Sequence, residues 1–285
     1  MTIQFASELL TQTTLTLIPI VQEGDQAAAQ ALQAVARSYH QELSSLQSVF
    51  TANKGELYYQ HTAQGDFLLV GLGTEPGFAQ TLKIFRQLVL KQPRYLRSQW
   101  QVSFLHQNLP SDLETSVEAI TNGLGQGRYQ IGKYKTVSKD EKTTFPELLR
   151  FGLAAPEASS LSRAAQRAWE IAEVQCRIMD LVNAPSNKKT PQQLAAWAQD
   201  SAKTHGYQVE VWDKDQIAAA GMGGLLAVNQ GSPTPPAFII LEYKGPKAPE
   251  HKVGLVGKGV TFDTGGLSIK PATNMHYMKS DMGGA

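Results

Sequence analysis

Apolar residues follow two different periodicities along the first part of the chain. Short apolar runs with many β-branched residues predict strands, and each is followed by a segment whose apolar residues recur at three- and four-residue steps. Ala79, Leu82, Phe85 and Leu88, for instance, would share one face of a helix. This succession predicts an N-terminal α/β domain whose helices pack on a sheet. The predicted strands are residues 14–20, 66–73 and 101–106, and the predicted helices are residues 26–38, 77–90 and 112–123.

A polar interruption follows this first region. Residues 138–144, SKDEKTT, offer little that could be buried, so they are a candidate linker or surface loop. We therefore expect two domains, with an assembly or regulatory domain in residues 1–145 and a second domain in residues 146–285. Residues 160–182 carry a long helical pattern, and we expect this helix to join the two domains.

A second succession of helix and strand begins after that helix. Thr190 and Pro191 predict an N-cap and the first turn of a helix that reaches about residue 204, and residues 207–212 predict a strand. Two apolar runs, residues 237–243 and residues 253–257, predict central strands of a mostly parallel sheet. The expected fold class is α/β, with an N-terminal α/β domain followed by the start of a second α/β domain that has a mostly parallel central sheet.

Charge and composition narrow the classes of function. The chain has 26 Lys and Arg against 25 Asp and Glu, and a formal net charge of +1 gives no field that would collect nucleic acid or anionic membrane. No apolar run approaches the ~18–20 residues that span a bilayer, and the first residues lack the features of a secretory signal. Cys176 is the only cysteine, which excludes an intrachain disulfide. We expect a cytoplasmic protein without nucleic-acid or membrane partners.

The segment of residues 253–271 carries the candidate chemistry. Lys258 stands between two glycines just after a predicted strand, and Asp263 is followed by Thr264 and two more glycines. Glycines permit close backbone approach, so these two side chains could aim at a common point at the carboxyl end of the strand. A glycine-rich surface turn with a solvated lysine is the alternative. A phosphate loop is excluded, because it needs Ser or Thr directly after the lysine, where this chain has Gly259.

Other common catalytic patterns are missing from the sequence. The six histidines show no HExxH spacing, and no G-x-S-x-G motif occurs, so neither a histidine-ligated zinc site nor a serine hydrolase is supported. Cys176 lies within the long predicted helix and is interpreted as a structural thiol.

Together with the segment MKSDMGGA at the end of the chain, Lys258, Asp263, Lys270 and Asp281 resemble the motif of the leucyl (cytosol) aminopeptidase family in identity and spacing. Residues 180–191, DLVNAPSNKKTP, and residues 221–232, GMGGLLAVNQGS, resemble further segments of that family in the same order. The first 150 residues resemble the family's N-terminal domain only loosely.

The resemblance implies a hydrolase that uses two divalent metal ions, Mn²⁺ or Zn²⁺, and releases N-terminal, Leu-like amino acids from peptides. It implies that Asp263 bridges the ions, and that Asp281 and the neutral amine of Lys258 are further ligands. A protonated Lys270 would be catalytic, because it could polarise the scissile carbonyl and stabilise the oxyanion. Met278 would contact the first substrate side chain; the alternative is a core methionine. A homohexamer is also implied.

The family's Asp-x-Glu-x-Arg segment, which supplies further ligands and a catalytic arginine, does not occur in the sequence. Asp213, Lys214 and Asp215 do not replace it and are interpreted as a surface turn or helix start. We therefore expect the 285-residue chain to be inactive alone. A different class remains open, namely a non-catalytic scaffold or binding protein derived from this family.

Overall fold

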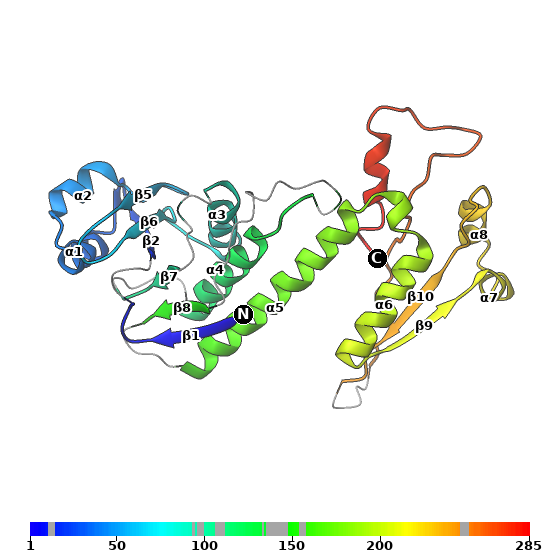
Figure 1. Cartoon of the computed structure of the whole chain (residues 1–285), viewed down its shortest axis with the longest axis horizontal. Helices are drawn as coiled ribbons and strands as arrows, with labels where there is room; N and C mark the ends of the chain where they lie inside the picture. The colour runs from blue at the N-terminus through cyan, green and yellow to red at the C-terminus, as the bar shows by residue number, and fades with distance from the viewer. Residues whose placement is uncertain are drawn as a thin grey trace. The chain divides into compact units, whose positions relative to one another are not determined.

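The computed structural model describes residues 1–10, 15–92, 95, 100–105, 112–132, 134, 148–153, 158–245 and 251–285. The chain forms two compact units, Met1–Cys176 and Arg177–Ala285 (Figure 1). Each unit is described by itself.

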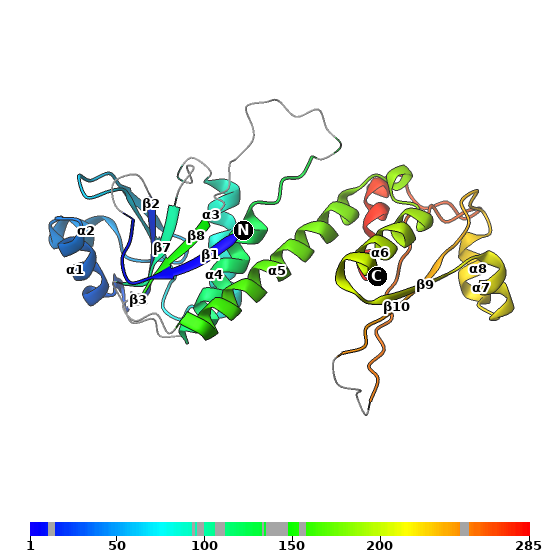
Figure 2. The same cartoon turned by 60° about the horizontal axis from the view of Figure 1, so that its bottom comes forward.

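A six-stranded sheet forms the centre of the first unit (Figure 2). Every neighbouring pair in it is parallel except the last, in which β5 and β6 form an antiparallel hairpin. This arrangement confirms the expected α/β class. The mostly parallel sheet lies in the first unit, whereas the sequence predicted such a sheet for the second domain. The strands lie in the order β1 (Thr2–Ala6), β8 (Leu148–Gly152), β7 (Trp100–Ser103), β2 (Leu15–Ile20), β6 (Phe67–Gly71) and β5 (Leu57–Gln60).

Helices cover both faces of this sheet, as Figures 1 and 2 show. Side chains of β2 alternate between two buried clusters: Leu17 packs with residues of α3 (Phe78–Lys91) and α4 (Leu113–Gly127), and Ile18 packs with residues of α1 (Ala29–Ser38) and α2 (Leu43–Val49). A strand that is buried on both faces needs mostly apolar residues, which explains why Thr16 is the only polar residue in the run of β2.

The helix predicted for residues 26–38 begins later than expected. Gln26–Ala27 is β4, which pairs with β3 (Gln22–Glu23), and α1 follows from Ala29. The helical periodicity of the apolar residues extends into this short hairpin, so the pattern alone did not reveal the start of the helix.

Glycines allow α4 to lie very close to its neighbours. A Cβ added at Gly123 would lie 2.5 Å from the carbonyl oxygen of Leu82 in α3, and one at Gly125 would lie 2.6 Å from the Cβ of Ala172. Ala172 belongs to the long helix α5 (Ala158–Asn183), which the sequence predicts well. Residues without a Cβ are therefore required on two faces of α4.

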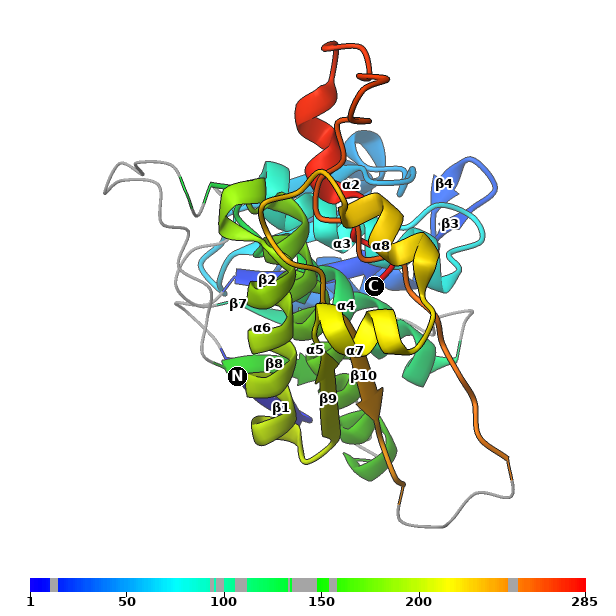
Figure 3. The same ribbon diagram turned by 90° about the vertical axis from the view of Figure 1, so that its right-hand side faces the viewer.

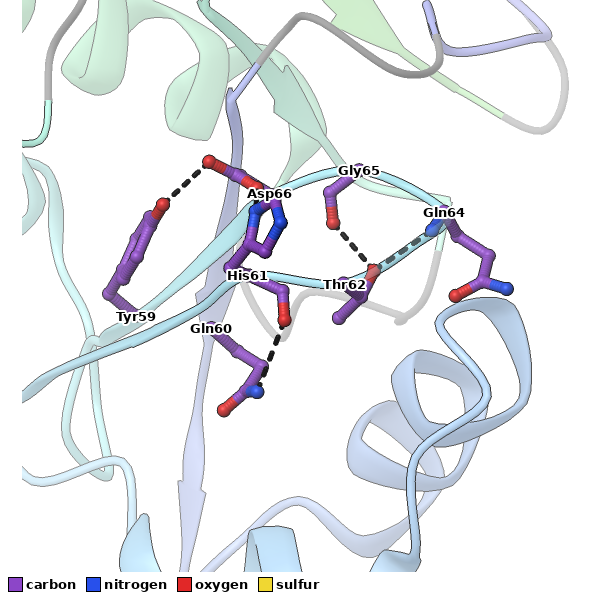
Figure 4. Close-up of polar contacts among 7 residues, drawn as sticks. All are labelled: Tyr59, Gln60, His61, Thr62, Gln64, Gly65 and Asp66. Atoms are coloured by element: carbon purple, nitrogen blue, oxygen red, sulfur yellow. Dashed lines mark hydrogen bonds and ion pairs between the residues drawn. The ribbon is translucent and has the colours of Figure 1, made fainter.

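A network of hydrogen bonds fixes the β5–β6 hairpin (Figure 4). The carboxylate of Asp66 accepts a 2.5 Å hydrogen bond from the Tyr59 hydroxyl and contacts Nδ1 of His61 at 2.5 Å. The Thr62 hydroxyl donates to the carbonyl oxygen of Gly65 at 2.6 Å, which closes the turn. These contacts join residues at the two ends of one turn, so they fix the register of the hairpin.

In the second unit, α6 (Pro191–His205) begins with the predicted N-cap. The Thr190 hydroxyl accepts from the backbone N–H of Gln193, and the side chain of Gln193 accepts from the backbone N–H of Thr190. This reciprocal pair is a capping box. Asp213 likewise caps α7 (Lys214–Ala219), which confirms the interpretation of that segment as a helix start.

The strands of the second unit differ from the expected arrangement. Two strands, β9 (Gln208–Trp212) and β10 (Phe238–Glu242), pair antiparallel, and α6 packs along them (Figure 3). A short helix, α8 (Gly223–Asn229), follows α7. Residues 253–257 form no strand, and Val256 is fully exposed. The expectation of central parallel strands at 237–243 and 253–257 is therefore wrong for the described residues. An apolar run favours an extended chain, but a strand also needs a hydrogen-bonding partner, and no described strand pairs with this run.

The expected domain division near residue 145 lies outside the described residues, as does the candidate linker 138–144. The division between residues 145 and 146 stays a prediction. In the structure β8, which follows it, belongs to the sheet of the first unit, and the boundary between the two units along the chain falls within α5, between Cys176 and Arg177. Among the described residues, no helix is long and apolar enough to cross a membrane.

Candidate active site

The candidate site residues lie on irregular segments of the second unit. Lys258 and Asp263 follow the apolar run 253–257, and Lys270 follows a turn that contains two glycines. The 3₁₀ helix η4 (Met275–Ser280) comes next, and Asp281 is its C-cap residue.

Lys258 and Asp281 form an ion pair. The Nζ of Lys258 lies 2.8 Å from Oδ2 of Asp281, and the two side chains are 63% and 45% exposed. The backbone N–H of Asp281 donates to the carbonyl oxygen of Met278 at 3.1 Å, which holds the aspartate at the end of η4. Residues that are distant in sequence thus bring an amine and a carboxylate together at an open position.

Asp263 and Lys270 form a second, more constrained pair. The Nζ of Lys270 donates to Oδ2 and to the carbonyl oxygen of Asp263, both at 3.0 Å. The other carboxylate oxygen of Asp263 accepts from the backbone N–H of Gly265 at 2.9 Å, and the N–H of Lys270 donates to the carbonyl oxygen of Thr264 at 2.9 Å.

The turn between these residues depends on glycine. Gly265 and Gly266 have φ values of +94° and +68°, a conformation that residues with a Cβ rarely adopt. A Cβ at Gly265 would also lie 2.4 Å from the carbonyl oxygen of Ser268, whereas one at Gly266 would meet nothing within 4 Å. The close return of the chain at Gly265 is what brings Lys270 back to Asp263.

Hydrogen bonding lowers the pKa of the Asp263 carboxyl group below its ordinary value. The backbone N–H of Gly265 is the largest cause, and the hydrogen bond and charge of Lys270 add to it. The charge of Lys258 acts in the same direction, so this lysine lies near enough to influence both aspartates. Asp263 is therefore held as a carboxylate.

The structure brings four of the five predicted site residues into two lysine–aspartate pairs. Met278 is half-buried in η4, three residues before Asp281. Its contact with substrate stays a prediction, as do the roles of the other four residues.

Two further lysines near the site escaped the sequence analysis. Lys189 is 1% exposed, and its ammonium donates to the carbonyl oxygens of Val182, at 3.4 Å, and of Lys279. Lys279 in turn donates to the carbonyl oxygen of Asn183 at 3.0 Å. Burial lowers the pKa of Lys189, and the charge of Lys279 lowers it further. In the sequence Lys189 is one of two adjacent lysines, and nothing there tells which of them is buried.

The donor atoms of the site suit a divalent cation. Carboxylate oxygens are favoured by Mn²⁺ and accepted by Zn²⁺, and an amine nitrogen can ligate either ion when it is neutral. Lys258 and Asp281 already converge at 2.8 Å, so they fit as neighbouring ligands of one ion. No group of three or more His, Cys, Asp or Glu side chains suited to a metal occurs within the described part of the chain. The residues therefore fit a partial metal site.

Comparison with known proteins relates the chain to cytosol aminopeptidases in both a family model and individual relatives. Residues 177–285 match the family described as "Cytosol aminopeptidase family, catalytic domain". A probable cytosol aminopeptidase of Geobacter sp. (strain M21) is 36% identical over 241 residues, which cover 83% of this chain and 48% of that protein. The corresponding protein of Chlorobium limicola (strain DSM 245 / NBRC 103803 / 6330) is also 36% identical and is matched over 83% of this chain and 50% of its own length.

Solved structures with a similar fold include two enzymes. A mutant of tomato leucine aminopeptidase aligns with a TM-score of 0.80 and 25% identity over 99% of this chain and 56% of that chain. The bottromycin maturation enzyme BotP in complex with Mn aligns with a TM-score of 0.72 and 28% identity over 96% of this chain and 54% of that chain.

The fold and the matched segment together define the class of protein, an α/β protein that carries catalytic-domain residues of a metallo-exopeptidase family. The chain belongs to the cytosol aminopeptidase family. It spans about half the length of the curated relatives that it matches.

Proposed function

We propose that the chain is part of a two-metal aminopeptidase that releases N-terminal, Leu-like amino acids from peptides. The main support is the pairing of Lys258 with Asp281 and of Lys270 with Asp263 inside the segment that matches the family's catalytic domain. These are the four residues for which the family motif implies chemistry.

Each residue has a distinct proposed role. Asp263, Asp281 and Lys258 would hold the divalent ions. Bound divalent ions would activate water and polarise the scissile carbonyl. Lys270 is held by two oxygens of Asp263 at 3.0 Å, and its ammonium is proposed to stabilise the negative charge that develops on the carbonyl oxygen. Met278 is proposed to contact the first side chain of the substrate.

Mn²⁺ is the favoured ion, because the similar enzyme BotP is described in complex with Mn. Zn²⁺ is the other ion that the family resemblance implies. A homohexameric assembly and a cytoplasmic location are also part of the proposal, and they rest on the resemblance and on the single cysteine.

The alternative class, a non-catalytic scaffold or binding protein, is not favoured by the comparisons. The relatives and similar structures reported above are described as aminopeptidases or as a maturation enzyme. A scaffold would keep its fold and its partners after metal removal and would show no peptidase turnover under any condition.

Metal removal tests the proposed function. In the natural protein that carries this sequence, exhaustive chelation should abolish hydrolysis of a leucine anilide, and Mn²⁺ or Zn²⁺ should restore it. Full activity in metal-stripped protein would contradict the proposal. The 285-residue polypeptide by itself should bind at most one Mn²⁺, weakly, and should show no turnover, because it offers an incomplete set of ligands. Two tightly bound ions with turnover would show that the ligand set is wrong.

A further inference from the structure

Lys189 is a buried cation whose hydrogen-bond acceptors are backbone carbonyls. Its side chain is 1% exposed, whereas the adjacent Lys188 is exposed. A buried ammonium group is costly unless it is hydrogen-bonded, so the position of Lys189 is tightly tied to its two acceptors, the carbonyl oxygens of Val182 and Lys279. A lysine in this setting constrains the segments that provide those oxygens.

The carbonyls of Val182 and Asn183 lie at the C-terminal end of α5. The last carbonyls of a helix have no donor within the helix and carry the negative end of its dipole. Lys189 donates to Val182 O at 3.4 Å, and Lys279 donates to Asn183 O at 3.0 Å. Two ammonium groups from different parts of the chain thus cap the same helix end.

Lys279 is held at both its backbone and its side chain. Its carbonyl oxygen accepts from Lys189, while its own ammonium reaches Asn183. We call the four residues Lys189, Lys279, Val182 and Asn183 the lysine clasp. Since Lys279 belongs to η4, the clasp attaches η4 to the end of α5.

This attachment lies next to the candidate site. Asp281 follows Lys279 by two residues, and its N–H donates to Met278 O within the same turn. Met282, the residue after it, is 4% exposed and anchors the segment on the other side. The Asp281 carboxylate is half exposed, and within the part of the chain that the structure describes its side chain contacts only Lys258, at 2.8 Å. Its position therefore depends on how firmly η4 is held.

We propose that Lys189 is a positioning residue that, through the lysine clasp, holds η4 against the end of α5 and so sets the place of the Asp281 carboxylate beside Lys258. The part of this inference that concerns metal binding rests on the proposed function. The part that concerns the attachment of η4 does not.

Hydrogen exchange of the 285-residue polypeptide tests the attachment directly. Lys189→Met keeps the apolar stem and removes the donor, and Lys188→Met is the matched control at an exposed lysine. Exchange in residues 275–285 should rise about tenfold in Lys189→Met and stay unchanged in Lys188→Met, while the exchange of β9, β10 and α6 is unaffected. No change in residues 275–285, or an equal rise throughout residues 177–285, would overturn the proposal.

A second variant covers the case in which Lys189→Met fails to fold. Lys279→Met changes a half-buried side chain and removes the other ammonium of the clasp. It should raise exchange in the same residues, and the double variant should add little to the larger single effect, because both residues act on one attachment. Unchanged exchange in Lys279→Met, or fully additive effects, would contradict a shared clasp.

Mn²⁺ binding to the natural protein separates positioning from a purely structural role. Lys189→Met should weaken Mn²⁺ affinity about tenfold, the lower end of the loss typical for groups that orient metal ligands, with an unchanged midpoint of thermal unfolding. Faster exchange with unchanged Mn²⁺ affinity would overturn the positioning role. If the unmutated protein binds no Mn²⁺, the proposed function fails, and the exchange experiment still decides whether the clasp exists.

Discussion

Lys258 and Lys270 carry the same functional group, yet the structure gives them different surroundings. Lys258 has one carboxylate oxygen at 2.8 Å and is 63% exposed, whereas Lys270 donates to two oxygens of Asp263 and is 41% exposed. A lysine with one open contact can exchange its partner for a metal ion more easily than one held by two. The difference agrees with the proposed division into ligand and oxyanion stabiliser.

The role of Lys270 can be separated from metal binding. Lys270→Ala in the natural protein should lower kcat by about 10²–10³, the usual effect of removing one oxyanion stabiliser, while the Mn²⁺ content stays intact. Lys252→Ala is a suitable control, because Lys252 is 91% exposed and its ion pair with Glu242 spans 3.9 Å. Steady-state kinetics and metal analysis are the measurements. Stoichiometric loss of metal in Lys270→Ala would make this lysine a ligand.

The two glycines of the site turn provide a matched pair of variants. Gly265→Ala and Gly266→Ala both place a side chain in a left-handed conformation, at a cost of about 1–3 kcal/mol, but only Gly265 adds a clash, at 2.4 Å from the carbonyl oxygen of Ser268. Gly265→Ala should therefore weaken Mn²⁺ binding more than Gly266→Ala does, as measured by titration calorimetry. Equal effects would mean that the close return of the chain is not needed to place Asp263.

At the scale of elements, α4 depends on close helix packing. It lies against α3 and α5, and its glycines remove the side chains that would keep the helix axes apart. The guanidinium of Arg128, directly after α4, lies 4.4 Å from the ring centroid of Trp169 in α5 and pairs with Glu173. Close packing against α3 and α5, rather than helix propensity, therefore requires glycine at positions 123 and 125 of α4.

A glycine-to-alanine change in α4 distinguishes propensity from packing. Propensity alone predicts that Gly123→Ala stabilises the helix by about 1 kcal/mol. Its Cβ would lie 2.5 Å from the Leu82 carbonyl oxygen, so we expect a net loss of about 1–2 kcal/mol in the free energy of unfolding. Urea unfolding followed by circular dichroism measures it.

Gly77→Ala is the control for that measurement. Gly77 is the N-cap of α3, and a Cβ there would meet nothing within 4 Å. Alanine is a poorer N-cap than glycine but would meet no clash here, so Gly77→Ala should lower the free energy of unfolding by less than about 1 kcal/mol. A Gly123→Ala variant more stable than the unmutated chain would show that α4 can move away from α3 at little cost.

At the scale of the whole molecule, apolar side chains gather on the surface of the second unit. Val253, Leu255 and Val256 are 87%, 93% and 100% exposed, and they are nearly consecutive in sequence. Contiguous exposed apolar groups favour association, and a formal net charge of +1 provides little repulsion between copies.

This surface predicts the solution behaviour of the 285-residue polypeptide. It should bind the hydrophobic dye ANS and self-associate, and the double variant Leu255→Ser, Val256→Ser should reduce both effects. Ile131→Ser is the control, since Ile131 is 73% exposed but lies apart from this run in the sequence. Dye fluorescence and light scattering are the measurements. An equal reduction by Ile131→Ser, or no reduction by the double variant, would contradict this explanation.

The sequence by itself determined the features whose partners lie within a few residues. Thr190 and Gln193 form a capping box, and Asp112 accepts from the backbone of α4's first turn, because each donor is at most three positions from its acceptor. The mostly apolar runs of β2 and β6 also predicted strands correctly, and both strands are buried. The resemblance of Lys258, Asp263, Lys270 and Asp281 to the family motif, in identity and spacing, was enough to select them as candidate site residues.

Only the tertiary structure decided features that depend on atoms far away in the sequence. The pairing of β9 with β10 is antiparallel, and the apolar run 253–257 has no partner strand among the described residues, because strand pairing is a contact between distant segments. The pairing of Lys258 with Asp281 is decided in the same way. Lys188 and Lys189 are chemically identical neighbours, and only the end of α5 and the carbonyl of Lys279 determine that one of them is buried.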